Sequence, residues 1–292
     1  MLAQVTLIPA ESKKLIAKGV ANMDIVRKAA TEGMIVLHPS SSTYFIVEEI
    51  TGTKPKTNYW VCGVVTPRGN CVEMGMLDSP PRSTSTPSGP RGFRSWWVIR
   101  NGKLSTGEEE ISELLEQMRP ADVFIKGVNA LDPQGNVGIL IGDPAAGGSL
   151  GLILSTWRKI SFHLVFPVGL EKLIPIPISQ ASKEAKPAMY DYAMGLATGL
   201  FPCPGGETVT EMDAIGILSG AIAVPIAAGG LGGAEGAITL IIRGNEEQVK
   251  KAINFVEQSK GAKLPPLRLR SCQGCPSLHC RFPVGDKHWA SV

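Results

Sequence analysis

The chain has 292 residues, of which 43% are hydrophobic and 19% are charged, a composition typical of a globular protein with one large or two smaller domains. Its net charge of +3, from 29 basic and 26 acidic residues, is too small to predict a nucleic-acid or membrane partner. A polar segment follows the first ten residues without the pattern of a secretion signal, so we expect a cytoplasmic protein.

The chain begins with a helical pattern followed by a strand. Apolar residues at helical spacing in residues 11–31 predict an amphipathic helix or a broken pair of helices. A strand at 34–38, a polar turn at 39–43 and a helix at 44–50 follow. The turn contains Ser40, Ser41, Ser42 and Thr43. Hydroxyls and backbone amides at a helix N-terminus can bind an anion, although the same residues can equally be a simple cap.

The next segment predicts a hairpin, a long loop and a helix. Residues 59–65 and 71–76 form the hairpin, and residues 79–94 are an irregular loop with three arginines. Such a loop is usually a lid, a binding loop or a disordered segment. A solvated, mobile loop without a role in binding is the simplest interpretation. A strand at 95–100 precedes a capping box at 106–109, which begins a helix that ends at Met118.

Residues 119–172 have the pattern of a parallel α/β sheet. Apolar runs at 123–127, 137–141 and 163–168 predict buried strands, and residues 144–159 predict a helix between the second and the third. Polar clusters follow the first two strands, at the sheet edge where open α/β sheets bind their ligands. We therefore predict an α/β fold with an open, mostly parallel sheet and helices on both faces.

This stretch resembles a known superfamily. Ile125-Lys126-Gly127, the turn from Asp132 through Asn136, and the glycines after it are similar to the sugar-phosphate isomerases and coenzyme A transferases, among them ribose-5-phosphate isomerase and methylthioribose-1-phosphate isomerase. The resemblance implies a phosphosugar site in which Lys126 takes part. It also places Asn129 where the methylthioribose-1-phosphate isomerases have their catalytic aspartate, and an amide cannot act as a general base.

The candidate site residues lie around this edge. Lys126 is expected to hold an anion, and Asp132, Asp122 or His38 to move a proton. Their simpler alternative roles are in turns, caps and strand ends. The candidate substrate-binding residues are Ser40, Ser41, Ser42, Thr43, Asn129, Asn136, Gly147, Gly148 and Ser149.

Two functions from different classes follow from these residues. The first is an enzyme that acts on a phosphorylated sugar or related metabolite by proton transfer next to a carbonyl. The second is a non-catalytic ligand sensor or assembly protein with a degenerate site. In both cases we expect a small phosphorylated or carboxylated ligand and a homo-oligomer, with no nucleic-acid or membrane partner.

The remainder of the chain predicts a smaller unit. We expect an α/β domain at 1–172, a linker at 173–206 with a short helix at 189–199, and a ferredoxin-like α+β domain at 207–268. In that domain, strands at 212–218 and 237–243 precede a helix at 245–260. Residues 214–234 are uncharged over the length of a membrane helix, but their glycines favour strand, loop and strand. The loop at 227–236 is either a close-packed connection or a ligand loop.

The tail at 269–292 contains three of the six cysteines. Cys272, Cys275, Cys280 and His288 are candidate ligands of tetrahedral zinc or of an iron-sulfur cluster. The alternative is a tail without metal. A structural clip is favoured over a catalytic metal, because all four ligands come from one short terminal segment.

Overall fold

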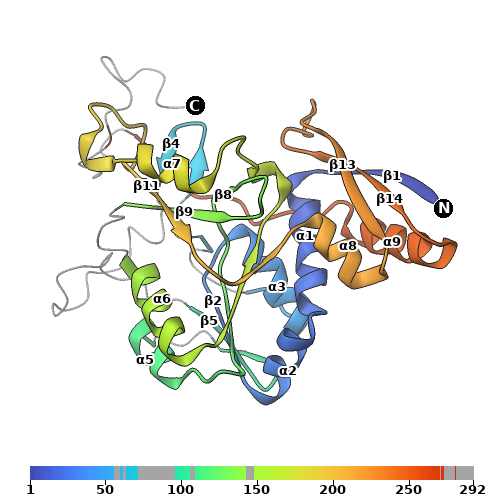
Figure 1. The fold of residues 1–292 in the computed structure, drawn as a ribbon, viewed down its shortest axis with the longest axis horizontal. Coiled ribbons are helices and arrows are strands. Elements are labelled where there is room, and N and C mark those ends of the chain that lie inside the picture. The colour runs from blue at the N-terminus through green and yellow to red at the C-terminus, as the bar shows by residue number, and fades with distance from the viewer. Residues whose placement is uncertain are drawn as a thin grey trace.

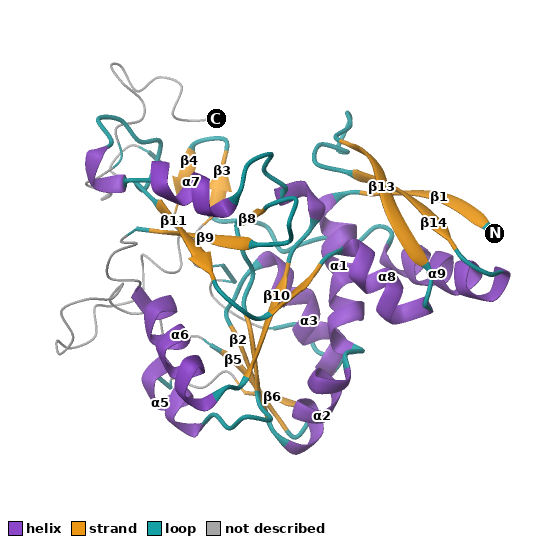
Figure 2. Ribbon diagram, in the orientation of Figure 1, coloured by secondary structure: helices purple, strands orange, loops and turns teal. Residues whose placement is uncertain are grey.

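The computed structural model describes residues 1–55, 60–61, 64–71, 96–105, 109–142, 148–269, 271–272 and 280. As predicted, these residues form an α/β fold around a largely parallel sheet, in the strand order β12-β10-β7-β2-β5-β6 (Figures 1 and 2). Its parallel strands are β2 (Met34–Leu37), β7 (Val123–Ile125), β10 (His163–Pro167) and β12 (Glu207–Val209). Two antiparallel strands, β5 (Trp97–Arg100) and β6 (Lys103–Ser105), complete one side.

Helices cover both faces of this sheet. One face carries α1 (Pro9–Ala21), α2 (Asp24–Glu32) and α3 (Ser41–Thr51), and the other carries α5 (Ile111–Gln117) and α6 (Gly148–Ile160) (Figure 1). Successive strand residues point to opposite faces: Ile35 and Ile125 pack with the first group of helices, and Val36 and Phe124 with the second. Burial on both faces explains why these strands have continuous apolar sequences.

A second sheet corrects one prediction. Residues 137–141 form β9 (Val137–Ile141), which pairs antiparallel with β8 (Ala130–Leu131) and β11 (Gly199–Cys203) outside the large sheet. Five residues connect β8 to β9. A parallel crossover needs a dozen or more residues, so this connection permits a hairpin and not the parallel strand that was expected.

A third sheet forms the smaller α+β unit. It consists of β1 (Leu2–Leu7), β14 (Ile238–Arg243) and β13 (Ile222–Ala228), all antiparallel, and it packs on α8 (Glu211–Ser219) and α9 (Glu246–Ser259). The strand predicted at 212–218 is wrong, because these residues form α8. Its ends are defined by a capping box between Thr210 and Asp213 and by Gly220 in the left-handed conformation.

Helix α1 joins the small unit to the large sheet. It packs on α3 on one side and on α8 and α9 on the other. A Cβ atom on Gly19 would lie 2.7 Å from Ala214 Cα, so α1 and α8 are in close contact. Two strands cross the expected boundaries, since β1 from the N-terminus belongs to the small sheet and β12 to the large one. A single apolar core includes residues from both sheets.

The remaining described elements are short. A hairpin forms in the expected region, but its strands β3 (Val64–Thr66) and β4 (Gly69–Cys71) differ from the expected ones, because β4 begins inside the predicted turn and residues 60–61 are not strand. The short helix η1 (Leu170–Lys172) directly precedes the expected linker, which contains α7 (Ile178–Glu184) and η2 (Pro187–Met189). The helix expected at 189–199 is wrong, because the chain is irregular after η2 until β11 begins at Gly199. Across the described residues, no helix combines the length and the apolar character needed to cross a membrane. Residues 79–94, the expected loop, lie outside the described residues.

Candidate functional site

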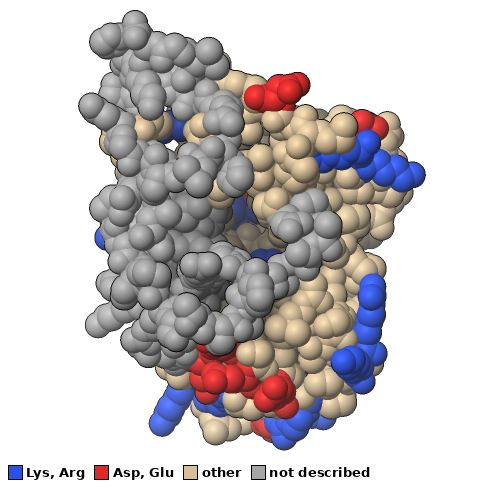
Figure 3. Space-filling model, turned by 90° about the vertical axis from the view of Figure 1, so that its left-hand side faces the viewer, with Lys and Arg blue, Asp and Glu red and all other residues tan. Residues whose placement is uncertain are grey.

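The carboxyl ends of the four parallel strands meet at one edge of the large sheet. The residues that follow them are His38 after β2, Lys126 after β7, Glu171 and Lys172 after β10, and Glu211 after β12. Ligands of open parallel sheets bind at this edge, because the loops that leave the strands converge there. One face of the molecule is also hollowed near its centre, and Lys or Arg atoms are visible inside the hollow (Figure 3).

The Ser/Thr turn lies directly beside the strand end that carries Lys126. Ser40 caps α3 by accepting a hydrogen bond from the Thr43 amide, and the buried Thr43 hydroxyl donates to the His38 carbonyl at 2.6 Å. A Cβ atom on Gly127 would lie 2.8 Å from Ser40 Oγ, so a glycine is required for this approach. Ser42 Oγ is buried and has no hydrogen-bond partner among the described residues. The structure therefore brings together the two predicted halves of an anion site.

His38 and Lys126 influence one another electrostatically. Lys126 is only 8% exposed. Burial and the nearby Lys126 cation lower the pKa of His38 well below its usual value, so its imidazole is neutral at pH 7. The ring packs edge-on against Trp96, with 5.1 Å between centroids. This environment stabilises an uncharged imidazole next to a cation.

A group of four charged residues at the same edge was not among the predicted site residues. We call Lys13, Glu171, Lys172 and Glu211 the buried charge cluster, in which Lys13 and Glu211 are buried and Glu171 and Lys172 are half-buried. Lys13 Nζ donates to Glu171 Oε1 at 2.6 Å, and Lys172 Nζ donates to the Val128 carbonyl at 2.6 Å. The backbone amide of Leu170 donates to both carboxylate oxygens of Glu211, at 3.2 and 2.9 Å. The cluster thus connects α1, η1 and α8 to the end of β7.

Two members of the cluster titrate near neutral pH. Burial and the Glu171 carboxylate raise the pKa of Glu211 to about 7, against the hydrogen bond from Leu170. Burial and the Lys13 cation lower the pKa of Lys172 to about 8, against the effect of the two glutamates. Groups with pKa values close to the working pH are suited to proton transfer, and such values concentrate at functional sites.

Glu171 carries an unpartnered oxygen. Its Oε1 atom binds Lys13, whereas its buried Oε2 atom has no hydrogen-bond partner in the part of the chain that the structure describes. The carboxylate folds back over Gly169, where a Cβ atom would overlap with it. An unsatisfied buried carboxylate oxygen is costly in a purely structural role and favours a donor supplied by a ligand or water.

The two predicted aspartates lie elsewhere and are engaged in structural hydrogen bonds. Asp122 is at the opposite, amino end of β7, where it accepts from the amides of Met34 and Arg119 at 2.8 and 2.7 Å. Asp132 accepts from the amides of Gln134, Asn136 and Ile178. Burial alone would raise the pKa of Asp132, but these hydrogen bonds outweigh it and lower the pKa. The structure does not bring either carboxylate next to Lys126.

The predicted amide ligands belong to the β8–β9 hairpin. Asn129 Oδ1 accepts from the Leu140 amide at 3.0 Å, and Asn136 Nδ2 donates to Asp132 Oδ2 at 3.0 Å. Gly148 and Ser149 are the first residues of α6, whereas Gly147 lies outside the described residues. The hydrogen bonds of the two asparagines hold the hairpin together.

Two of the four predicted metal ligands lie outside the described residues. Cys275 and His288 are not described, whereas Cys272 and Cys280 are. Cys280 Sγ accepts from the Gly195 amide at 3.2 Å. Among the described residues, no three or more His, Cys, Asp or Glu side chains are grouped so as to hold a metal ion. The zinc or iron-sulfur site therefore remains a prediction.

Comparison of the chain with family models, with curated proteins and with solved structures finds no match. The resemblance to the sugar-phosphate isomerases consequently remains a prediction from its motifs.

Proposed function

We propose that the protein binds a small phosphorylated or carboxylated metabolite at the carboxyl edge of β2 and β7, and that it transfers a proton next to a carbonyl of this ligand. The observation that carries the proposal is the contact between the Ser/Thr turn and the strand end with Lys126. Gly127 lies against Ser40, so the strand end that carries the buried Lys126 and the capped N-terminus of α3 are adjacent segments that can together offer a cation and hydrogen-bond donors to one anionic group.

The buried charge cluster supports the proton-transfer step. Asp122 and Asp132 are saturated by backbone amides, so neither is the acid or base in this proposal. Glu211 and Glu171 follow the neighbouring strands at the same edge and take that role instead. The pKa of Glu211, at about 7, allows this carboxyl group to exist in both protonation states at neutral pH.

A non-catalytic ligand sensor or assembly protein is the second candidate. The oxygen of Asn129 is bonded to the Leu140 amide, and this residue stands where the similar isomerases have a catalytic aspartate. Such a protein would keep the anion site and lack turnover.

Thermal unfolding with a panel of sugar phosphates and small carboxylates tests the binding step. A ligand at a hundred times its dissociation constant adds about 2.7 kcal/mol, which raises the midpoint by a few degrees in a chain of this size. We expect Lys126→Met to abolish the shift. Lys250→Met is the matched control, because Lys250 is an exposed lysine on α9. A shift that survives in Lys126→Met would overturn the proposed site.

Solvent exchange then separates the two candidates. An enzyme that moves a proton next to a carbonyl incorporates deuterium from D2O into the bound metabolite, which NMR detects. Incorporation that requires Glu211 would support the enzyme. Binding without incorporation would support the sensor or assembly protein.

A further inference from the structure

A second lysine, Lys172, follows a strand at the same edge of the sheet as Lys126. Lys172 ends η1, directly after β10, and its Nζ atom is hydrogen-bonded to the carbonyl of Val128, two residues beyond Lys126. Strands β7 and β10 are neighbours in the sheet. Lys126 and Lys172 therefore follow neighbouring strands at the edge where the ligand is proposed to bind.

We propose that Lys172 forms a covalent imine with the ligand, which narrows the substrate class to aldehydes and ketones that carry a phosphate or carboxylate group. This inference rests on the proposed function. In addition to the proposed function, the imine activates the carbonyl as an iminium ion, which makes the neighbouring C–H group more acidic.

The groups around Lys172 fit this role. Lys13 from α1 is held in its ion pair with Glu171, so a fixed cation lies near the Lys172 amine, while Glu171 and Glu211 bring carboxyl groups from η1 and α8. A desolvated lysine close to another cation loses its proton readily and becomes nucleophilic. A neutral amine retains two hydrogens, so it can donate one to Val128 and still present its lone pair to a carbonyl carbon.

The pKa of Lys172, at about 8, supports the geometric argument. At pH 7 the neutral fraction of such an amine is roughly two to three hundred times that of an ordinary lysine. Lys250 on α9 is 65% exposed and paired only with Glu246, and it provides an internal reference for non-specific modification.

Imine formation requires a nucleophile and an acid, and Lys172 and Glu211 supply them. The Lys172 lone pair attacks the carbonyl carbon, and a proton moves from nitrogen to oxygen to give a carbinolamine. The C–O bond then breaks as the nitrogen lone pair forms the C=N bond, and protonated Glu211 gives its proton to the departing hydroxyl. The products are the iminium ion, one water molecule and the Glu211 carboxylate, which is then available to accept a proton from the adjacent carbon.

Reductive trapping of the full chain tests the imine. The protein is incubated at pH 7 with dihydroxyacetone phosphate or pyruvate and sodium cyanoborohydride, digested, and mapped by mass spectrometry. We expect Lys172 to gain the mass of the carbonyl compound less one oxygen atom, at least tenfold faster than Lys250. Lys172→Arg keeps a donor for Val128 but forms no imine, so we expect it to remove this adduct. Glu211→Gln is expected to slow trapping.

The outcomes distinguish this inference from the function on which it rests. Adducts on exposed lysines without enrichment at Lys172 would overturn the imine, and a Lys126-dependent thermal shift would then leave the anion site standing. Absence of both the shift and the adduct would overturn both. The peptide map of the unsubstituted protein decides the question even if Lys172→Arg fails to fold.

Discussion

Lys13 and Glu171 are 158 positions apart in the sequence, and their side chains form an ion pair of 2.6 Å at the carboxyl edge of the sheet. The pair joins α1, which contacts both the large sheet and the small unit, to the turn after β10. Both side chains are close to fully buried, with exposed fractions of 8% and 12%. The pair therefore links the architecture of the protein to its candidate site.

Breaking this ion pair from one side is expected to destabilise the protein. Lys13→Met leaves Glu171 buried without its cation and should cost about 3 kcal/mol, measured by urea unfolding. The double variant Lys13→Met/Glu171→Met removes both charges and should cost less than the sum of the single variants. Additive costs would show that the two side chains are not coupled.

Substitution of Glu211 should change how stability depends on pH. The carboxyl group has an ordinary pKa of 4.5 and a pKa of about 7 in the folded protein, so the folded state binds its proton more tightly. Its stabilising contribution is complete below pH 4.5 and is lost as the pH rises through 7. Relative to the unsubstituted protein, Glu211→Gln should therefore gain up to about 3 kcal/mol of stability between these pH values. If the difference in the free energy of unfolding between the two proteins does not vary with pH, the raised pKa of Glu211 is contradicted.

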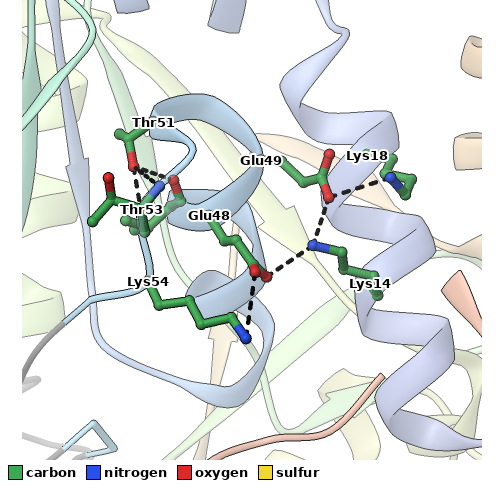
Figure 4. Close-up of polar contacts among 8 residues, drawn as sticks. Lys14, Lys18, Glu48, Glu49, Thr51, Thr53 and Lys54 are labelled. Atoms are coloured by element: carbon green, nitrogen blue, oxygen red, sulfur yellow. Dashed lines mark hydrogen bonds and ion pairs between the residues drawn. The ribbon is translucent and has the colours of Figure 1, made fainter. Parts of the chain in front are cut away.

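A network of ion pairs between α1 and α3 should contribute to stability below about pH 10. Lys14 contacts Glu48 and Glu49 at 2.8 and 2.6 Å, with Lys18 and Lys54 at the ends of the network (Figure 4). Burial lowers the pKa of Lys14, but its hydrogen bonds to the two glutamates raise it above 10.5 overall. The contribution of Lys14 is thus fully present below pH 10.5 and is lost as the pH rises through the raised pKa.

Removal of Lys14 tests this network. Lys14→Met should reduce the free energy of unfolding by about 1–3 kcal/mol at pH 7, as determined by chemical denaturation. Lys54 contacts the same Glu48 but is 68% exposed, so the control Lys54→Met should change stability by less than about 0.5 kcal/mol. Equal effects of the two substitutions would show that burial does not strengthen the Lys14 contacts.

The contact between α1 and α8 predicts opposite results for two glycines. Alanine normally stabilises a helix relative to glycine, but a Cβ atom on Gly19 would lie 2.7 Å from Ala214 Cα and would push the helices apart. We expect Gly19→Ala to lower the free energy of unfolding by about 1–3 kcal/mol. Gly216 in α8 has only one atom within 4 Å of such a Cβ, at 3.9 Å, so Gly216→Ala should stabilise by about 0.5–1 kcal/mol in the same assay.

Elements with strong local patterns could be predicted from the sequence. Strands β2, β7 and β10 follow from apolar runs bounded by turns, and α9 follows from its apolar spacing and the Asn245 cap. The direction of β9 depends on the length of its connection to β8, which apolar periodicity alone does not reveal. The apolar run of α8 also fits a strand, because periodicity does not separate short buried helices from strands.

The candidate site could be predicted only in part. Lys126 and the Ser/Thr turn were found because each directly follows a strand in the sequence. Glu171 and Lys172 follow β10 in the same way, so that signal was present. Lys13 carried no such signal, because a lysine on an amphipathic helix normally faces solvent. Its burial results from the small unit packing over α1.

Calorimetric titration tests the anion site. A phosphorylated or carboxylated metabolite, selected by thermal unfolding, is titrated into three proteins. These are the unsubstituted chain, Lys126→Met and Lys250→Met. The proposed site predicts that Lys126→Met weakens binding by at least about tenfold, or 1.4 kcal/mol, whereas Lys250→Met leaves the affinity unchanged. Equal affinity in all three proteins would contradict an anion site at the carboxyl edge of β2 and β7.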